Sequence, residues 1–353
     1  MILDGLAASS IATAVQLIRS GGLVGLPTET VYGLGADAEN DEAVAAIFRA
    51  KGRPADHPLI VHVADAACAA HFAATVPDFA QRLMQAYWPG PLTLIMPRRQ
   101  GVAAAAAGGQ DSIGLRCPSH PVAQALLKEL KNGGQIPIKK ELESDPHFVW
   151  GIAAPSANQF GRVSPTTAQH VQSEFGPELL VLDGGPCAVG IESTIIDCTR
   201  GAPVLLRPGA VTRAQVQAVC GQPVRSQEEL AAGLPAPRAS GTLESHYAPR
   251  ARVRLMDAKA LQTALDLLGA DGDGAEGSPV IATYSRAVLR TGSVKVLRRQ
   301  MPGDPSTAAQ QLFAALRELD ALGVKLIWVE APPQTPEWDA VRDRLQRASA
   351  GLD

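Results

Sequence analysis

The chain has 353 residues, of which 46% are apolar and 19% are charged, and its formal net charge at pH 7 is −3. This length predicts two domains, and the low charged fraction argues against a disordered protein. The slightly negative charge excludes a globally basic surface for nucleic acid, although a local basic groove stays possible. The N-terminus lacks the pattern of a signal peptide and no apolar run is long enough for a bilayer, so we expect a cytoplasmic protein.

Several familiar motifs are missing from the sequence. The five cysteines are scattered without a CxxC pair or a His/Cys cluster at zinc spacing, which predicts reduced, mostly buried thiols and no protein-built metal site. There is also no P-loop, no GxGxxG fingerprint, no GxSxG elbow and no HExxH motif. The common sequence signatures of nucleotide binding, serine hydrolysis and zinc proteolysis are therefore absent.

The N-terminal two hundred residues alternate short apolar runs with helical patterns, which predicts an α/β or α+β domain. Strands are expected near residues 23–26, 59–63, 92–96, 112–116, 152–154, 179–182, 195–197 and 203–206. Helices are expected to begin at Ser9 or Ser10, at Asn40 or Asp41, and near residues 77, 121, 164 and 212. Polar side chains recur where strands end, so we expect a site gathered from strand ends and loops.

The most informative stretch is LVGLPTETVYGLG, from Leu23 to Gly35. It begins as an apolar strand that Pro27 ends, and a hydroxyl, a carboxylate and a second hydroxyl follow at once. Polar groups crowded at the end of a buried strand are costly unless they have partners. The glycines at 33 and 35 allow a sharp turn or a close approach to a ligand. An ordinary strand-to-loop junction is the plain alternative for the whole stretch.

Two further segments allow a structural or a functional interpretation. The turn Lys51-Gly52-Arg53-Pro54 has the cations, glycine and proline of an ordinary helix C-terminus, but two cations on a tight turn could also clamp an anion. A single strand histidine such as His62 is more often structural than functional.

The polar excursion over residues 131–149 is expected to decorate the surface rather than cover the site.

The C-terminal part has its own alternation of strands and helices. Residues 221–250 are rich in Pro, Gly, Ser and Ala, which predicts a linker, although its end, SGTLESHYAP, is more specific than a spacer requires. Beyond it we expect strands near 252–256, 280–284, 294–297 and 325–330, with helices over 258–268, 306–322 and 338–348. The predicted domains are therefore 1–220 and 251–353, joined by 221–250.

Cations and hydroxyls are the remaining candidates for chemistry. Arginine forks and hydroxyl groups suit phosphates and carboxylates, so one site could hold a nucleotide and an amino acid together. The set comprises Lys51, Arg53, Arg116 and Arg207, with Thr28, Thr30, Ser112, Ser156, Ser164 and Ser193.

Several short motifs, taken in order, resemble the threonylcarbamoyl-AMP synthase family, whose catalytic module is the YrdC-like domain. They are PTETVYGL from Pro27, KGRP from Lys51, PL from Pro58, SAN from Ser156 and LRPG from Leu206. KxR and SxN are hallmarks of that family; each is weak alone, but the ordered set is specific. The resemblance covers residues 21–220, and the HYAP segment and C-terminal unit resemble the long form. It implies a twisted open α/β catalytic domain, a linker that acts as a lid, and a smaller Rossmann-like α/β domain.

The resemblance implies that L-threonine, bicarbonate and ATP give L-threonylcarbamoyl-AMP and pyrophosphate. The threonine nitrogen would be carboxylated first, and the carbamate oxygen would then attack the α-phosphorus of ATP, with Mg²⁺ on the phosphates. The product would pass to a separate transferase that forms threonylcarbamoyladenosine beside the anticodon of tRNA. Positioning and charge neutralisation would dominate catalysis.

The resemblance also implies a role for each matching residue. The threonine pocket would contain Thr30, His62, Arg116, Ala154 and Ser193, with the fork of Arg116 on the carboxylate. The ATP side would contain Arg53, His57, Ser112, Ser156, Ser164 and Arg207, with Tyr247 folded over the nucleotide. The catalytic set would be Lys51, Arg53, Ser156 and Asn158, with Lys51 stabilising charge on the carbamate or phosphate. His57 replaces an asparagine common in relatives, so ATP binding could depend on pH.

Two other functions stay open. Hydrogenase-maturing carbamoyltransferases contain a YrdC-like module, but they are far longer and carry zinc-finger-like cysteines and an acylphosphatase-like start, which this chain lacks. A non-catalytic RNA-binding module would need a basic face with stacking aromatics, and only 4% of the residues are aromatic. We therefore expect neither stable tRNA binding nor membrane association.

Overall fold

The structure is a computed structural model that describes residues 1–132, 148–226, 229, 237–241, 246–269 and 280–350. Its contacts divide the chain into two compact units. The first contains Met1–Phe160 and Ser164–Thr242, and the second contains Gly161–Val163 and Leu243–Asp353. Most of the excursion predicted over 131–149 lies outside the described residues.

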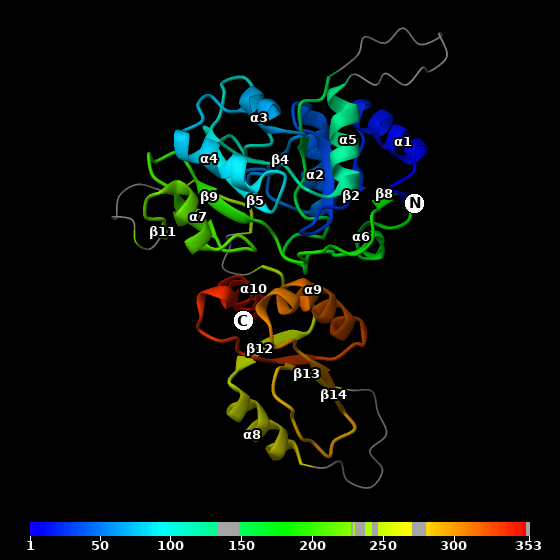
Figure 1. Cartoon of the computed structure of the whole chain (residues 1–353). Coiled ribbons are helices and arrows are strands. Elements are labelled where there is room, and N and C mark those ends of the chain that lie inside the picture. The colour runs from blue at the N-terminus through cyan, green and yellow to red at the C-terminus, as the bar shows by residue number, and fades with distance from the viewer. Residues whose placement is uncertain (133–147, 227–228, 230–236, 242–245, 270–279, 351–353) are drawn as a thin grey trace. The chain divides into compact units, whose positions relative to one another are not determined.

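A mixed β-sheet forms the centre of the first unit (Figure 1). In the part of the chain that the structure describes, its strand order is β1 (Ile2–Asp4), β8 (Leu180–Asp183), β2 (Val24–Leu26), β3 (Gly33–Asp37), β7 (Ile152–Ala153), β4 (Ile60–His62), β6 (Ser112–Arg116), β5 (Leu92–Pro97), β9 (Thr194–Asp197), β10 (Val204–Arg207) and β11 (Arg225–Ser226). Neighbours far apart in sequence often pair, as β1 and β8 do. This order brings polar residues from distant segments to adjacent strand ends.

Helices cover this sheet and bury their apolar sides against it. They are α1 (Ala8–Arg19), α2 (Asp41–Lys51), α3 (Ala66–Phe72), α4 (Asp78–Tyr87), α5 (Pro121–Lys131), α6 (Ala168–Phe175) and α7 (Arg213–Cys220). Asn40 caps α2 by accepting a hydrogen bond from the Ala43 N–H, and Gly52 ends it in the left-handed region at φ 61°. The predicted start and end of this helix are thus confirmed.

Three local expectations are wrong. The first helix begins at Ala8 without a side-chain cap, because Ser9 and Ser10 already lie inside it. The helix expected near residue 164 begins at Ala168, after the N-cap Thr167. Gly33 lies inside β3 rather than in a turn, and so does Gly35, where a Cβ would come within 2.8 Å of Ile152 and Leu26. These glycines therefore allow close strand packing instead of a bend.

The second unit contains a four-stranded parallel sheet among its described residues. Its strand order is β12 (Arg252–Met256), β15 (Leu326–Glu330), β13 (Ile281–Ser285) and β14 (Val296–Gln300). Figure 1 shows α8 (Ala258–Leu268) on one side of the sheet, with α9 (Pro305–Ala321) and α10 (Asp339–Ser349) on the other. A short 3₁₀ helix, η1 (Pro336–Trp338), precedes α10. The predicted α/β class is confirmed for both units.

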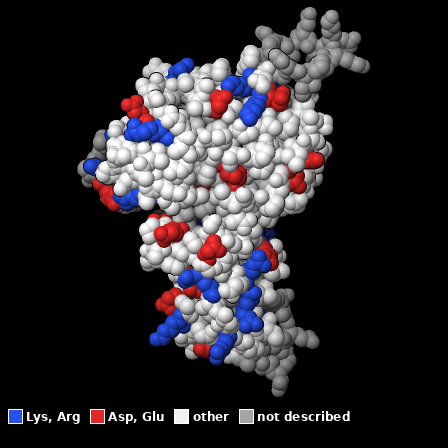
Figure 2. All heavy atoms as spheres, viewed as in Figure 1, with Lys and Arg blue, Asp and Glu red and all other residues white. Residues whose placement is uncertain are grey.

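All five cysteines are free and buried, as predicted. Burial raises the pKa of each thiol above its ordinary value. None of the described helices has the length and apolar character needed to cross a bilayer. On the face of the first unit shown in Figure 2, basic and acidic side chains are interspersed, in keeping with the net charge of −3.

Candidate active site

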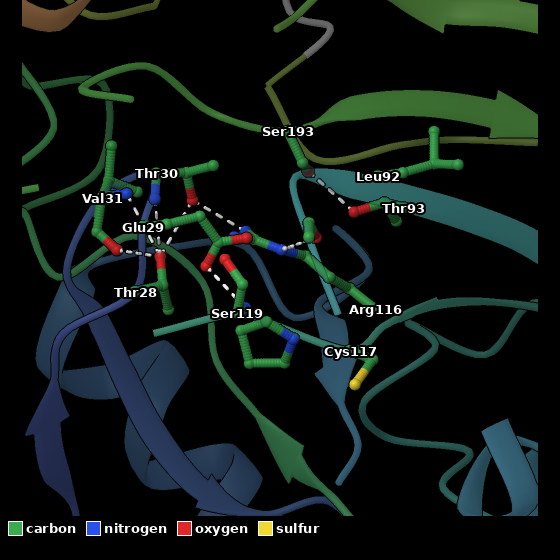
Figure 3. A network of polar contacts seen from close by, with 12 residues as sticks. Thr28, Glu29, Thr30, Val31, Leu92, Thr93, Arg116, Cys117, Ser119 and Ser193 are labelled. Atoms are coloured by element: carbon green, nitrogen blue, oxygen red, sulfur yellow. Dashed lines mark hydrogen bonds and ion pairs between the residues drawn. The ribbon is translucent and has the colours of Figure 1, made fainter. Parts of the chain in front are cut away.

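The site lies where strands of the first unit end. His62 ends β4 and Arg116 ends β6, and the two residues are partners in the parallel register of these neighbouring strands. Because side chains of register partners project from the same face, the sheet itself places the imidazole beside the guanidinium. The turn after β2 supplies Glu29 and Thr30 to the same place (Figure 3).

The turn after β2 is held by the hydroxyl of Thr28. Its Oγ1 accepts hydrogen bonds from the Thr30 and Val31 N–H groups, both at 3.2 Å, and donates to the Val31 carbonyl at 2.6 Å. It also lies 2.9 Å from the Thr30 hydroxyl. A hydroxyl that folds back on its own backbone in this way fixes a tight turn. Thr30 is therefore fully buried with a defined side-chain direction.

Arg116 is the centre of this cluster. Its Nη1 donates to Thr30 Oγ1 at 2.8 Å and its Nε donates to the Gly90 carbonyl at 3.3 Å. Its Nη2 lies 2.8 Å from Glu29 Oε1, and both side chains are almost fully buried. Burial alone would raise the pKa of Glu29, but the adjacent guanidinium brings it below its ordinary value. The Glu29 carboxyl group is therefore ionised at neutral pH.

His62 is 3% exposed and is held neutral. Burial, followed by the charge of Arg116, lowers its pKa from 6.5 to about 3. Its Nδ1 makes no hydrogen bond with any residue that the structure describes. Ala154, also assigned to the threonine pocket, follows β7 and donates its N–H to the Ile60 carbonyl on β4 at 3.0 Å. These residues provide a neutral, partly apolar wall beside Arg116.

Ser193 joins the predicted threonine and ATP sides. Its hydroxyl lies 2.7 Å from Thr93 Oγ1 and accepts from Arg207 Nη2 at 3.2 Å, while its carbonyl accepts from Arg207 Nε at 3.0 Å. All three residues are buried. Figure 3 shows the Ser193–Thr93 contact beside Arg116. The two predicted subsites therefore adjoin.

The KxR and SxN motifs meet through Lys51. Its Nζ donates to the Ser156 carbonyl at 2.6 Å and also contacts the Asn158 carbonyl. The Asn158 amide in turn donates to the Gln159 carbonyl at 2.7 Å. Burial, followed by the charge of Arg53, brings the pKa of Lys51 well below its ordinary value. In this structure the side-chain amino group of Lys51 thus holds the SxN turn.

Part of the predicted linker lies on the ATP side. Arg53 donates to the Pro58 carbonyl at 2.9 Å and to Ser240 Oγ at 3.1 Å, and Arg207 donates to the Ser240 carbonyl at 2.8 Å. A small cavity of about 10 Å³ lies here, lined by residues that include Ser112 and Ser240. One residue of the linker thus contacts both arginines assigned to ATP.

The other predicted ATP ligands lie in varied surroundings. The ring of His57 lies 5.6 Å from that of Phe160, and burial, followed by Arg53, lowers its pKa. Ser164 is fully buried, and its hydroxyl contacts Glu192. Tyr247 belongs to the second unit, where its ring lies 5.3 Å from that of Phe313. Its role as a lid stays a prediction.

Four polar residues of the site were absent from the predicted set. They are Glu29, Thr93, Glu192 and Ser240. Glu29 lies inside the stretch from Leu23 to Gly35, and its partner Arg116 belongs to the predicted set, but no local pattern indicates that the two residues pair. Thr93 stands in an apolar strand and gave no signal. Ser240 lies in SGTLESHYAP, the end of the predicted linker, which is more specific than a spacer requires.

Comparison with known proteins gives matches over nearly the whole chain. A sequence profile described as "Telomere recombination" matches residues 16–209, and one described as "Threonylcarbamoyl-AMP synthase, C-terminal domain" matches residues 211–350. The threonylcarbamoyl-AMP synthase of Bacillus subtilis is 37% identical over 344 residues, which cover 97% of this chain and 93% of the relative. That of Pyrococcus abyssi is 37% identical over 344 residues, which cover 96% and 94%. The structure of P. abyssi Sua5 complexed with L-threonine has a TM-score of 0.83 at 33% identity, covering 99% of this chain and 97% of that one.

A mixed-sheet domain of the YrdC-like class, with cations and hydroxyls at its strand ends, is therefore followed by a smaller parallel α/β domain. The chain belongs to the threonylcarbamoyl-AMP synthase family, in its two-domain form. It is an enzyme of the nucleotidyltransferase type, as the sequence motifs predicted.

Proposed function

We propose that this enzyme converts L-threonine, bicarbonate and ATP to L-threonylcarbamoyl-AMP and pyrophosphate. The observation that supports this most directly is the contact of Arg207 Nη2, on the ATP side, with Ser193 Oγ, in the threonine set, at 3.2 Å. A carbamate made on threonine can react with the α-phosphorus only if the two subsites adjoin. The similarity to a Sua5 structure complexed with L-threonine supports the same assignment.

The proposed reaction has two steps. The α-ammonium group of threonine first loses a proton. The amine nitrogen then forms a bond to the carbon of bicarbonate, and a C–O bond of bicarbonate breaks so that its hydroxyl leaves as water with a second proton from the nitrogen. A carbamate oxygen then forms a bond to the α-phosphorus of ATP, and the bond from that phosphorus to the bridging oxygen breaks, which releases pyrophosphate. Mg²⁺ would reach the site on the phosphates and neutralise part of their charge; the described residues contain no cluster of three His, Cys, Asp or Glu for a metal ion.

The residues of the site would bind and orient the substrates. Arg116 would hold the threonine carboxylate, with Thr30, His62, Ala154 and Ser193 around it. Arg53 and Arg207 would bind phosphate oxygens, with His57, Ser112, Ser156 and Ser164 beside them and Tyr247 as a lid. Lys51 and Asn158 would fix the turn that carries Ser156. Preorganised donors of this kind stabilise charge as it develops.

The product would supply a separate transferase that modifies tRNA beside the anticodon. We propose that this occurs in the cytoplasm without stable binding of tRNA by this chain. A gel-shift titration with tRNA at moderate salt tests the last point, and tight binding would contradict it.

The reaction is tested by pyrophosphate release from ATP, with and without L-threonine and with and without bicarbonate. We expect release to require both, and L-serine to be a much poorer substrate. Release that ignores threonine would point to another acceptor. No release from any mixture would overturn the proposed reaction.

A further inference from the structure

The pair formed by Glu29 and Arg116 has hydrogen-bonding capacity that the protein does not use. Arg116 Nη2 and Glu29 Oε1 form a buried ion pair at 2.8 Å, and each of the two atoms has only the other as its partner among the described residues. Neither atom has another hydrogen-bond partner among the described residues, and both are buried. A buried charged atom without a hydrogen bond is costly, so such atoms commonly await a ligand or water.

The rest of the pair is fixed in place. Glu29 Oε2 accepts from the Ser119 N–H at 3.0 Å, and the Glu29 carbonyl accepts from the Val189 N–H at 2.7 Å. Arg116 is held through Nη1 and Nε by Thr30 and Gly90. A buried donor and a buried acceptor are therefore presented side by side by a rigid framework, as Figure 3 shows.

The spacing of these two atoms suits a zwitterion. In an α-amino acid the ammonium nitrogen and the nearer carboxylate oxygen are joined only through Cα and the carboxyl carbon, so they also lie close together. We infer that Glu29 recognises the α-ammonium group of the amino acid whose carboxylate Arg116 binds. This inference rests on the proposed function, and it names the residue that binds the amino group of the substrate.

Electrostatics favour the same ligand. With His62 neutral, the positive Arg116 and the negative Glu29 give this part of the site no net charge. A lone buried arginine would attract any monoanion, whereas the pair favours a dipole whose negative end meets Arg116 and whose positive end meets Glu29. Hydroxy acids and N-acylated amino acids carry only the negative end, so Glu29 disfavours them. Once the nitrogen is carboxylated its positive charge is gone, so Glu29 selects the substrate rather than the carbamate.

The test compares two ligands by calorimetric titration of the full chain. One is L-threonine, and the other is 2,3-dihydroxybutanoate of matching stereochemistry, in which a hydroxyl replaces the amino group. We expect the wild type to prefer L-threonine by about tenfold or more. Glu29→Gln should weaken the binding of L-threonine by about tenfold and the binding of the hydroxy acid by less than about threefold. The reason is that only L-threonine has an ammonium group to interact with the negative charge of Glu29.

Two further variants separate recognition from folding. Glu29→Asp keeps the charge, so it should keep a preference for L-threonine even if both affinities fall. Glu330→Gln is the matched control, because Glu330 is also buried and paired with an arginine, Arg286, but in the second unit. It should lower the free energy of unfolding and leave both affinities unchanged.

The outcomes distinguish this inference from the proposed function. Equal weakening of both ligands by Glu29→Gln, or no preference in the wild type, would overturn the role of Glu29. Either result would overturn the role of Glu29 even if the same preparation releases pyrophosphate in the presence of threonine and bicarbonate. Wild-type protein that binds L-threonine selectively but never releases pyrophosphate would instead overturn the reaction.

Discussion

Lys51 shows how one buried amino group can organise a motif. Its Nζ holds two carbonyls of the SxN turn, and only 2% of the residue is exposed. This explains why a lysine and a serine-asparagine pair so far apart in sequence belong together. The local pattern predicted an ordinary helix C-terminus, which the structure confirms at Gly52, while the role of this turn as an anion clamp stays a prediction.

Lys51→Met tests this arrangement. Methionine keeps the apolar stem but removes the donor that Lys51 gives to the buried Ser156 and Asn158 carbonyls, so we expect the free energy of unfolding to fall by about 2 kcal/mol. Displacing the SxN turn should lower kcat for pyrophosphate release by about a hundredfold. Lys128→Met, at an exposed position of α5, is the control and should change neither quantity. Wild-type turnover in Lys51→Met would contradict the assignment.

His62 predicts a pH dependence of stability. Its pKa is about 3 in the native state and 6.5 ordinarily, so below pH 6.5 the unfolded chain takes up a proton that the native chain does not. Stability should therefore fall as the pH drops, by about 2 kcal/mol at pH 5 from this group alone. Chemical denaturation of wild type and His62→Gln at pH 7 and 5 measures the difference. Identical pH slopes in the two proteins would rule out a buried neutral imidazole.

At the scale of elements, the ends of α2 were predictable because their signals are local. Asn40 and Gly52 act within one turn of the helix, and each residue type has a direct physical reason to stand there. The start of α6 was predicted too early, since Ser164 and Thr167 are both acceptable caps and only the buried contact of Ser164 with Glu192 distinguishes them. The residues at which strands end were also predictable, but the order of the strands in the sheet was not.

Gly52 ends α2 and lies between two residues of the predicted catalytic set. It adopts φ 61° between Lys51 and Arg53, with open space where a Cβ would lie. Gly52→Ala should therefore cost about 1 kcal/mol of unfolding free energy through backbone strain alone. Gly221, which ends α7 at φ 65°, also with open space, is the matched control.

The two variants should lose similar stability, but only Gly52→Ala should lower kcat. Gly303 has open space where a Cβ would lie and no positive φ, so Gly303→Ala should introduce no backbone strain. Thermal melts and pyrophosphate release measure both effects. Equal activity of the Gly52 and Gly221 variants would show that the turn after α2 does not position the site.

For the whole molecule, the class of each unit followed from the sequence, whereas the strand order did not. Ile2 pairs with Val181 and His62 with Arg116, and no local pattern encodes such pairings. The same limit applied to the site: Thr30 and Arg116 could be named from motifs, but Glu29 became significant only when the sheet placed it against Arg116. Motifs thus identify candidate residues, and the sheet topology decides which of these residues lie in contact.

Two units with separate cores predict separable unfolding. Ligands that bind only the first unit stabilise it by mass action, by about 2.7 kcal/mol at a hundred times Kd. In scanning calorimetry, L-threonine alone, whose proposed ligands all lie in the first unit, should therefore raise the melting temperature of one transition and leave the other unchanged. A single transition that moves as a whole would show that the two units unfold together.

The buried cysteines have a practical consequence. Since every native thiol is buried with a raised pKa, maleimide dyes should find almost no reactive sulfur on the folded enzyme. Single cysteines introduced at Leu6, 78% exposed in the first unit, and Leu267, 84% exposed in the second, could then carry a donor and an acceptor fluorophore. The native sequence is thus a suitable background for measuring, one molecule at a time, the distance between the two fluorophores with and without substrates.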